Sequence, residues 1–292
     1  MRLTQLSDAE RRPRRIAVGE FDGVHLGHRE VIRGSDTVLT FEPHPLRVVR
    51  PETAPKLITS LEAKAELVAG LGVQELVVIP FDQGFAHQSP QAFIDDVLIG
   101  RLGATHVSVG ENFRFGHGAA GDPGLLAADG RFETRVVDLV EVDGEVVSSS
   151  HIRALLLAGE VEAAGRLLGA PFRMRGIVVT GDRRGRELGY PTANLVPDEA
   201  LVCPGHGVYA ARADGRCAAV NVGVRPTFGT GRAVLVEAYL LDTDLDLYGR
   251  PLTIEFLARL RGERRFESVQ ALVEQMGRDV ERTREICARG AC

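Results

Sequence analysis

The spacing of apolar residues changes repeatedly along the first 168 residues of the chain. Short runs rich in Val, Ile and Thr alternate with segments in which apolar residues recur at helical spacing, a pattern typical of βαβ units and a parallel sheet. One helix is predicted from Leu61 onward, after the start signal Thr59-Ser60, and another is predicted after Ser89-Pro90. The strands predicted for this half are 16–18, 37–40, 76–79 and 106–109.

The pattern changes after Gly169-Ala170-Pro171, which ends a helical segment. From Phe172 onward, apolar runs are separated by Gly, Asp and Pro turns without intervening helices, which predicts an antiparallel barrel or sandwich. We therefore expect two domains, residues 1–168 and residues 169–292. The strands predicted for the second are 174–180, 207–213, 217–222, 234–241 and 252–257. A terminal helix is expected to face the core with its apolar positions, which are Val269, Leu272, Val273, Met276, Val280 and Ile286.

The composition excludes several classes of protein. The chain of 292 residues is 44% hydrophobic and has a formal net charge of −5, which argues against a general nucleic-acid binder. No apolar run approaches the roughly 18–20 residues that span a bilayer, and no signal peptide is recognisable. The four cysteines form no C-x-x-C pair, which argues against a zinc ribbon or a disulfide framework. We expect a cytoplasmic protein without membrane or nucleic-acid partners, and we interpret the arginines of 11–15 as a solvated N-terminal arm.

The segment directly after the first predicted strand carries the first candidate chemistry. His25 and His28 are three residues apart and share one face of a helical turn, and Gly27 allows a ligand to approach closely. A helix N-terminus with two imidazoles would suit a phosphate that gains negative charge during displacement at phosphorus. A pair of satisfied surface histidines and a metal site are the alternatives.

A second polar cluster, Ser148 to Arg153, lies at a later strand-to-helix junction of the same half. Its hydroxyls, helix N–H groups and guanidinium could hold phosphate oxygens, whereas the alternative is an ordinary serine cap followed by a solvated arginine. Ligands of parallel sheets bind at the carboxyl ends of the strands, which is where both clusters fall. Together they indicate a nucleoside triphosphate that is held from two sides.

The second half carries its own candidate site. Gly181, Gly185 and Gly189 recur at intervals of four in a polar loop, which would let backbone N–H groups approach a phosphate, although a long hairpin loop is the alternative. Thr192 and Asn194 point the same way in an extended segment and offer oxygen ligands of the kind that Mg²⁺ accepts.

Glu237 is a carboxylate within a strand of apolar residues. In a ligand cleft it could orient or deprotonate a hydroxyl nucleophile. The alternative is the outward position of a half-exposed strand.

The first half resembles the adenylyltransferase module of the prokaryotic bifunctional riboflavin kinase/FAD synthetases. The resemblance rests on Gly19-x-Phe21-Asp22-Gly23-x-His25-x-Gly27-His28, on 40–45, on 110–116 and on 148–153. It implies a Rossmann-like fold and attack of the FMN phosphate on the α-phosphorus of ATP with release of pyrophosphate. It also implies roles for His25, His28 and Arg153 in catalysis, for Gly19, Phe21, Gly27, Ser149 and Ser150 in ATP binding, and for Asn112 and Phe113 in flavin binding.

The second half resembles the riboflavin kinase module of the same family, through 176–194, 221–228, Glu237, 247–249 and 260–266. The resemblance implies a β-barrel that transfers the γ-phosphoryl group of ATP to the ribityl hydroxyl of riboflavin. It implies that Glu237 is the base, that Thr192 and Asn194 hold Mg²⁺, and that Gly181, Gly185 and Gly189 cradle ATP. Arg261 and Glu263 would lie in a flap beside the flavin, or else in a solvated loop.

Two departures from the family pattern concern the first half. Only residues 29–36 separate His28 from the next strand, so we expect a shortened helix, and Ser150 stands where the family has threonine. The leading hypothesis is a bifunctional enzyme that converts riboflavin to FMN and FMN to FAD. A kinase with an inactive first module and a non-catalytic flavin-binding protein are the alternatives. We expect small-molecule substrates and a monomer or weak homo-oligomer.

Overall fold

The computed structural model describes the chain except for residues 181–189, 228–230, 244, 246 and 290–292. The described residues form two compact units, Met1–Ser149 and Ser150–Cys292.

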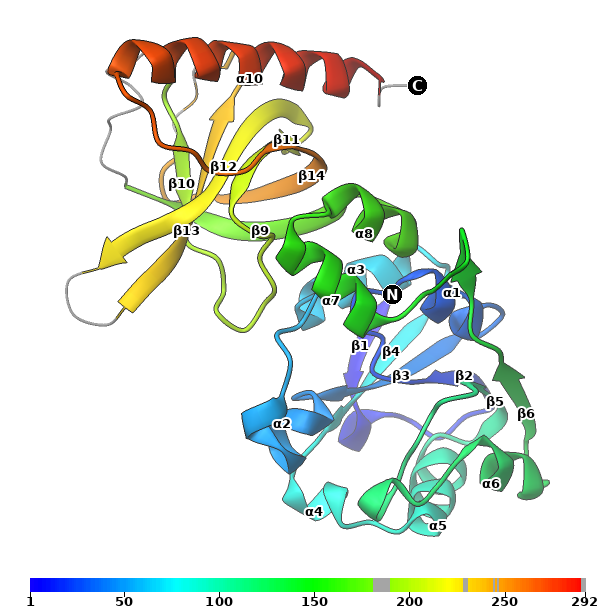
Figure 1. The fold of residues 1–292 in the computed structure, drawn as a ribbon. Coiled ribbons are helices and arrows are strands. Elements are labelled where there is room, and N and C mark those ends of the chain that lie inside the picture. Colours follow the sequence, from blue (N-terminus) through cyan, green and yellow to red (C-terminus); the bar gives the residue numbers. More distant parts are fainter. Residues whose placement is uncertain (181–189, 228–230, 244, 246, 290–292) are drawn as a thin grey trace. The chain divides into compact units, whose positions relative to one another are not determined.

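The first unit is built on a six-stranded parallel sheet with the order β1-β4-β3-β2-β5-β6 (Figure 1). The predicted α/β fold with a parallel sheet is therefore confirmed. The central strands are buried on both faces, as expected when helices cover a parallel sheet. The strands are β1 (Arg2–Gln5), β2 (Arg14–Val18), β3 (Thr37–Glu42), β4 (Glu75–Pro80), β5 (Ala104–Gly110) and β6 (Glu133–Val137), followed by the small hairpin β7 (Glu141–Val142) and β8 (Glu145–Val146).

The helices of this unit are short. α3 begins after Ser60, whose hydroxyl accepts a hydrogen bond from the Ala63 N–H at 3.2 Å, so the start signal lies at Ser60. The predicted shortening of the helix after His28 is confirmed, because α1 spans only seven residues. The helical segments are α1 (Leu26–Ile32), α2 (Pro45–Val49), α3 (Leu61–Ala69), α4 (Gln83–Ala86), α5 (Pro90–Ala92), the π-helical segment Phe93–Arg101, α6 (Pro123–Ala128) and short 3-10 turns at Leu6–Asp8, Pro51–Thr53 and His117–Ala119.

Strand β2 occupies the point where the strand order reverses. The chain runs from β2 to β3 and β4 on one side and later returns to pair β5 with the other side of β2. Open α/β sheets bind ligands at such a point, outside the carboxyl ends of the strands. The loops that follow β2 and β5 therefore lie where a ligand site is expected.

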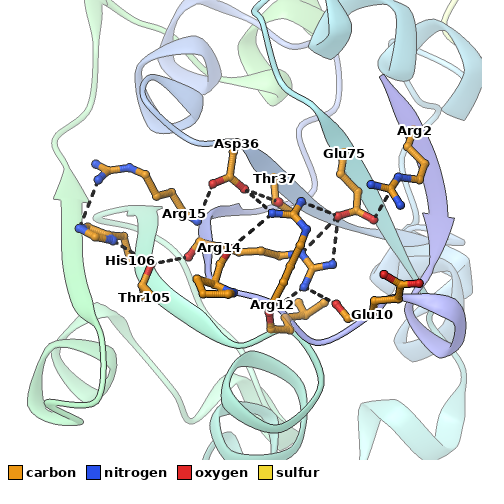
Figure 2. Close-up of polar contacts among 12 residues, drawn as sticks. Arg2, Glu10, Arg12, Arg14, Arg15, Asp36, Thr37, Glu75, Thr105 and His106 are labelled. Carbon is orange, nitrogen blue, oxygen red and sulfur yellow. Dashed lines mark hydrogen bonds and ion pairs between the residues drawn. The ribbon is translucent and has the colours of Figure 1, made fainter.

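The opposite, amino end of the sheet holds a buried ion-pair network (Figure 2). Arg14 is 1% exposed, and its guanidinium donates to Oε2 of Glu75 at 3.0 and 3.2 Å and to the carbonyl oxygens of Glu10 and Leu102 at 2.7 Å. Arg12 donates to the same carboxylate at 2.9 Å. The interpretation of residues 11–15 as a solvated arm is therefore wrong for Arg14, because this residue opens β2 and neutralises the buried carboxylate that opens β4.

The second unit holds a closed antiparallel barrel with the order β10-β13-β12-β11-β14-β9 (Figure 1). A barrel rather than a sandwich is confirmed. Alternate side chains such as Val236, Ala238, Ile254 and Phe256 fill its interior. The elements are α7 (Ser149–Ala158), α8 (Val161–Leu168), β9 (Phe172–Val179), β10 (Ala193–Leu195), β11 (Gly207–Ala213), β12 (Arg216–Thr227), β13 (Gly231–Leu240), β14 (Pro251–Arg261) and α10 (Val269–Arg289).

The hairpin of α7 and α8 is fastened to this barrel. Arg259 donates to the carbonyl oxygens of Ala158 at 2.9 Å and His206 at 2.8 Å, and Glu162 accepts its backbone N–H at 3.3 Å. Gly159, with φ of +82°, leaves the space these groups need, since a Cβ there would lie 2.6 Å from the Tyr209 hydroxyl. The boundary between the two compact units falls after Ser149, the first residue of α7, whereas the change in sequence pattern follows α8.

The terminal helix α10 is present, but its buried face differs from the predicted one. Its buried residues are Asp279, Thr283 and Cys287, whereas Val269 is 64% exposed and the other predicted apolar positions are half-buried. Arg261 donates to both carboxylate oxygens of Asp279, at 2.8 to 3.3 Å, and Arg212 donates to the Cys287 carbonyl at 3.2 Å. The predicted apolar stripe is therefore confirmed only in part: five of its six positions are half-buried, but the fully buried positions of the helix were not among those predicted.

Candidate functional site

The loop after β2 has a strained backbone. Phe21 has φ of 52° and Val24 has φ of 43°, with Gly23 at 86° between them. A β-branched residue with positive φ is a genuine outlier, and such strain persists only where the surroundings hold it. Asp22 provides this support, because its carboxylate accepts the N–H groups of Ile58 and Thr59 at 2.8 to 3.1 Å. The loop is thus fixed in shape before any ligand arrives.

His25 and His28 come together at the start of α1, as predicted. Nδ1 of His25, the N-cap residue, accepts the backbone N–H of His28 at 3.2 Å, so the ring proton of a neutral His25 is on Nε2. The rings stack with centroids 3.5 Å apart and 17° between their planes. A Cβ on Gly27 would lie 3.3 Å from Cε1 of His25, so the small residue leaves room for this ring.

The environment of His28 disfavours its charged form. Burial lowers the pKa of His28 well below its ordinary value, and the neighbouring His25 and the Lys64 ammonium lower it further. Its ring and that of Phe21 form a T-shaped pair with centroids 5.3 Å apart, and Nδ1 of His28 is buried without a hydrogen-bond partner. The free protein therefore holds a neutral imidazole with unused hydrogen-bonding capacity.

Lys64 is a residue of this site that the sequence reasoning missed. It is 2% exposed, and its ammonium donates to the Glu20 carbonyl at 2.6 Å and to the Thr40 hydroxyl at 3.2 Å. Burial raises the pKa of Glu20 to about 7 even though the Lys64 ammonium, 3.4 Å away, lowers it. A signal was present, because Lys64 falls on the apolar face of α3, between Leu61 and Val68.

The second polar cluster contacts the same loop through Ser149. The Ser149 hydroxyl donates to the Asp22 carbonyl at 3.0 Å, and the Val147 carbonyl lies near Gly27. Within α7, Arg153 donates to the Ser150 hydroxyl at 3.3 Å, so these two side chains share one face of that helix. The first unit therefore brings Ser149 to the loop after β2 that leads to His25 and His28, which we call the histidine loop.

The loop after β5 buries one of its two phenylalanines and leaves the other accessible. Phe115 is 7% exposed and buried in the core, whereas Phe113 is half-buried and stacks on it with centroids 5.6 Å apart. Asn112 is exposed at the turn. Phe113 and Asn112 are therefore accessible at the carboxyl end of β5.

A row of polar side chains crosses three strands of the barrel. Asn194 of β10 lies directly opposite Glu237 of β13, which in turn lies opposite Asn221 of β12. Directly opposed residues point to the same face, and their neighbours Val236 and Ala238 fill the interior, so the row lies on the outer face. Asn221 donates to Oε2 of Glu237 at 3.3 Å. Glu237 is therefore half-buried and held in position, and Asn221 is a further residue of this row that the sequence reasoning missed.

Thr192 precedes β10 and is half-buried, and its carbonyl accepts a hydrogen bond from the Asn194 amide at 3.4 Å. Asn194 itself is 5% exposed. Hydroxyl and amide oxygens are hard ligands, so the pair suits a Mg²⁺ ion that also binds phosphate oxygens. The predicted ATP loop with Gly181, Gly185 and Gly189 lies outside the described residues.

Arg261 and Glu263 follow β14. Arg261 is held by Asp279 of α10 and lies 5.7 Å from the ring centroid of Phe266. Glu263 is half-exposed, and one of its oxygens lies close to the backbone of Gly223, two residues after Asn221. Glu263 thus borders the polar row, while Arg261 is engaged by the terminal helix.

The two units define a two-domain flavin-nucleotide transferase. Residues 7–151 match the family model of FAD synthetase, and residues 168–287 match that of riboflavin kinase. The chain belongs to the family of bifunctional riboflavin kinase/FMN adenylyltransferases. Relatives with that name include those of Listeria monocytogenes, 38% identical over 94% of this chain and 92% of the relative, and Escherichia coli, 37% identical over 97% and 96%.

A solved structure from Streptococcus pneumoniae, named a macrolide-efflux protein, has a similar fold. It is 31% identical to this chain, with a TM-score of 0.89, and the similarity covers 97% of this chain and 99% of that one. Within the described part of this chain, no helix has the length and apolar character that crossing a membrane requires.

Proposed function

We propose that the chain is a bifunctional enzyme that phosphorylates riboflavin to FMN with ATP and then adenylylates FMN to FAD with release of pyrophosphate. The observation that carries this proposal is the presence of both family matches, one on each compact unit. A kinase without adenylyl transfer would leave the strained histidine loop unused. A flavin-binding protein without turnover would leave the row of Asn194, Glu237 and Asn221 unused as well.

In the kinase unit, Glu237 accepts the proton of the attacking ribityl hydroxyl, which forms the new O–P bond as the γ-phosphoryl group leaves ADP. Phosphoryl transfer asks a protein mainly for positioning and charge neutralisation. Thr192 and Asn194 would hold Mg²⁺, which would supply that neutralisation at the phosphates. The loop with Gly181, Gly185 and Gly189 cradles ATP, and Arg261 and Glu263 border the flavin.

In the adenylyltransferase unit, a phosphate oxygen of FMN attacks the α-phosphorus of ATP, and the bond to pyrophosphate breaks. His25 offers its Nε2–H to the phosphates, and His28 supports the charge that develops there. Gly19, Phe21 and Gly27 shape the pocket for ATP, and Ser149, Ser150 and Arg153 hold phosphate oxygens. Asn112 and Phe113 contact the flavin, for which the accessible face of Phe113 is suited.

The remaining assignments concern the whole protein. We place the functional boundary at residues 168–169, where the match to the riboflavin kinase model begins. We assign the enzyme to the cytoplasm, as a monomer or weak homo-oligomer without nucleic-acid partners. Analytical ultracentrifugation of the purified protein tests the oligomeric state.

Two separate assays test the proposal. Purified protein is incubated with riboflavin plus Mg-ATP, and separately with FMN plus Mg-ATP, and FMN, FAD and pyrophosphate are measured by chromatography. Glu237→Ala should abolish FMN formation and spare FAD formation from supplied FMN, and His28→Ala should do the reverse. Loss of both activities in either folded variant contradicts the two-site assignment. FMN formation without FAD formation by the wild type would favour the kinase-only alternative.

A further inference from the structure

Lysine is rare in this chain. It occurs only as Lys56 and Lys64, and 33 of the 35 Lys and Arg side chains are arginines. Lys56 is exposed, whereas Lys64 lies in α3 and is buried. An ammonium is a compact group with three donors and a guanidinium is a planar fork, so the two are not interchangeable where the placement of the acceptors decides. The surroundings of Lys64 must therefore favour an ammonium over a guanidinium.

The Lys64 ammonium donates to three oxygens that come from two other segments. These are the Glu20 carbonyl at 2.6 Å, Oε1 of Glu20 at 3.4 Å and the Thr40 hydroxyl at 3.2 Å. The Thr40 hydroxyl in turn donates to the same Glu20 carbonyl at 3.1 Å. The shortest of the three contacts is with the backbone, so the ammonium fixes the path of the histidine loop and not only the side chain of Glu20.

The carbonyl that Lys64 holds belongs to the peptide that leads into Phe21. Phe21 has φ of 52°, and its ring forms the T-shaped pair with the ring of His28. A Cβ on Gly19 would lie only 3.0 Å from the Phe21 ring, so the loop encloses this ring on a second side. The orientation of the Glu20–Phe21 peptide therefore determines where the Phe21 ring lies, and that ring limits where the His28 imidazole can lie.

The residues before α3 hold the other end of the same turn. The Asp22 carboxylate accepts the Thr59 N–H at 3.1 Å, and the Gly23 N–H donates to the Thr59 hydroxyl at 3.1 Å. A strained turn keeps its shape only where its surroundings hold it. Without the ammonium, the Thr40 hydroxyl would be left to hold the Glu20 carbonyl, and the turn could relax at that end.

We propose that Lys64 is a positioning residue for adenylyl transfer, which fixes the Glu20 carbonyl and thereby the places of the Phe21 and His28 rings. The inference rests on the proposed function of the first unit. Because the ammonium is buried and each of its three N–H groups has an acceptor, Lys64 acts through the loop and not on a substrate. A neutral imidazole depends on such placement, since its hydrogen bonds weaken steeply when they are misaligned.

Steady-state kinetics of the full-length protein tests this role. Lys64→Met keeps a long unbranched side chain without the ammonium. It should lower kcat for FAD formation from FMN and Mg-ATP about 10- to 100-fold, because a displacement of about 1 Å at a reacting centre can cost about 100-fold. The KM values for FMN and ATP should change less than about threefold. Lys56→Met is the matched control and should change neither quantity, and both variants should still phosphorylate riboflavin.

Nuclear magnetic resonance tests the position of the ring without relying on activity. At about pH 8 the His28 ring is neutral, and nuclear Overhauser effects between the ring protons of Phe21 and His28 should be present in the wild type and in Lys56→Met. They should weaken or disappear in Lys64→Met. A residue that only stabilised the fold would leave them unchanged in the folded variant.

Thr40→Val is the second variant, because it keeps the ammonium and removes the hydroxyl that shares the Glu20 carbonyl. It should lower kcat for FAD formation in the same direction, about 3- to 10-fold. Unchanged kcat and unchanged Overhauser effects in folded Lys64→Met overturn the proposal, and if Lys64→Met does not fold, the same result in Thr40→Val overturns it. A wild type that forms no FAD from FMN contradicts the proposed function instead, while the Overhauser effects still test whether Lys64 positions the His28 ring.

Discussion

The side-chain amide of Asn221 donates a hydrogen bond to Oε2 of Glu237, directly across from it on the neighbouring strand. On its other side Glu237 faces Asn194, so a single carboxylate stands between two amides on the outer face of the barrel. A strand holds its side chains in fixed rows, so the register sets the direction of one carboxylate oxygen of Glu237. The proposed function assigns the other oxygen to the riboflavin hydroxyl.

Asn221→Ala should lower the turnover number of riboflavin phosphorylation about 10- to 100-fold, because a hydrogen bond to a charged group contributes about 1.5 to 3 kcal/mol. The KM for riboflavin should change much less, since Asn221 positions Glu237 and is not assigned to flavin. Steady-state kinetics of FMN formation measures both quantities. FAD formation from supplied FMN provides the control for folding.

A double-mutant cycle separates positioning from a general structural effect. In a Glu237→Gln background, the further change Asn221→Ala should have little effect on the residual rate, because the carboxylate that Asn221 orients is already gone. Additive losses in the double variant would mean that Asn221 acts independently of Glu237. This result would remove it from the site while leaving the assignment of Glu237 intact.

Glu75→Gln should destabilise the first unit by about 3 to 5 kcal/mol, because it leaves the guanidinium of Arg14 buried without its charge partner. Urea unfolding followed by circular dichroism measures this loss. Glu133→Gln is the matched control: its carboxylate pairs with His106 but is 83% exposed, so the change should stay within about 0.5 kcal/mol. Equal effects of the two substitutions would contradict the structural importance of the Arg14 network.

The ion pair of Arg14 and Glu75 also predicts that the fold is less stable in acid. Burial raises the pKa of Glu75, but hydrogen bonds from Arg14, Thr4 and Arg12 outweigh it and lower the pKa overall. A carboxylate whose pKa is lower in the folded state stabilises the fold above its unfolded value of about 4.3, and this contribution is lost as the pH falls through the folded pKa. Wild type and Glu75→Gln should therefore converge in stability toward pH 3.

Local patterns predicted most elements of the fold but not the partners that cross between elements. Strand β11 spans Gly207–Ala213 as predicted, because its flanking turns mark both ends. The three-residue strand β10 was predicted only as an extended segment around Thr192 and Asn194, since a strand of that length carries no periodicity. The buried position of Asp279 on α10 was not predicted, because it depends on Arg261, which lies 18 residues earlier.

In the candidate site, too, local sequence patterns predicted single elements but not the contacts between them. The spacing of His25 and His28 was sufficient to place both on one helical turn. Lys64 was missed because its importance arises from β3 and the loop after β2, which meet it only in the folded unit. Asn221 has no distinguishing spacing, and only the register of β12 against β13 shows that it contacts Glu237.

His28 should stay neutral well below pH 6.5, since burial, His25 and Lys64 all lower its pKa. The unfolded chain takes up a proton near its ordinary value of about 6.5 while the folded chain does not, so the free energy of unfolding should fall as the pH drops below that value. Nuclear magnetic resonance titration of the His28 ring proton measures the pKa directly. His25→Gln should raise it, and a His28 pKa near 6.5 in the wild type would contradict the burial argument.

Glu20 should change the pH dependence of stability in the direction opposite to that of His28. Burial raises its pKa to about 7 against the lowering effect of Lys64, so the folded state keeps a proton that the unfolded chain releases near 4.5. The contribution of Glu20 to stability is therefore lost as the pH rises from about 4.5 to 7. Glu20→Gln should keep the hydrogen-bonding shape without the buried charge, and above pH 7 it should be more stable than the wild type by about 1 to 3 kcal/mol.

Urea unfolding measures this difference, and at pH 4 the wild type and Glu20→Gln should be equally stable. Glu62→Gln, on the exposed side of α3, should change neither value by more than about 0.5 kcal/mol. A Glu20→Gln variant that is less stable than the wild type at pH 8 would show that the Lys64 pair outweighs the cost of burying the carboxylate.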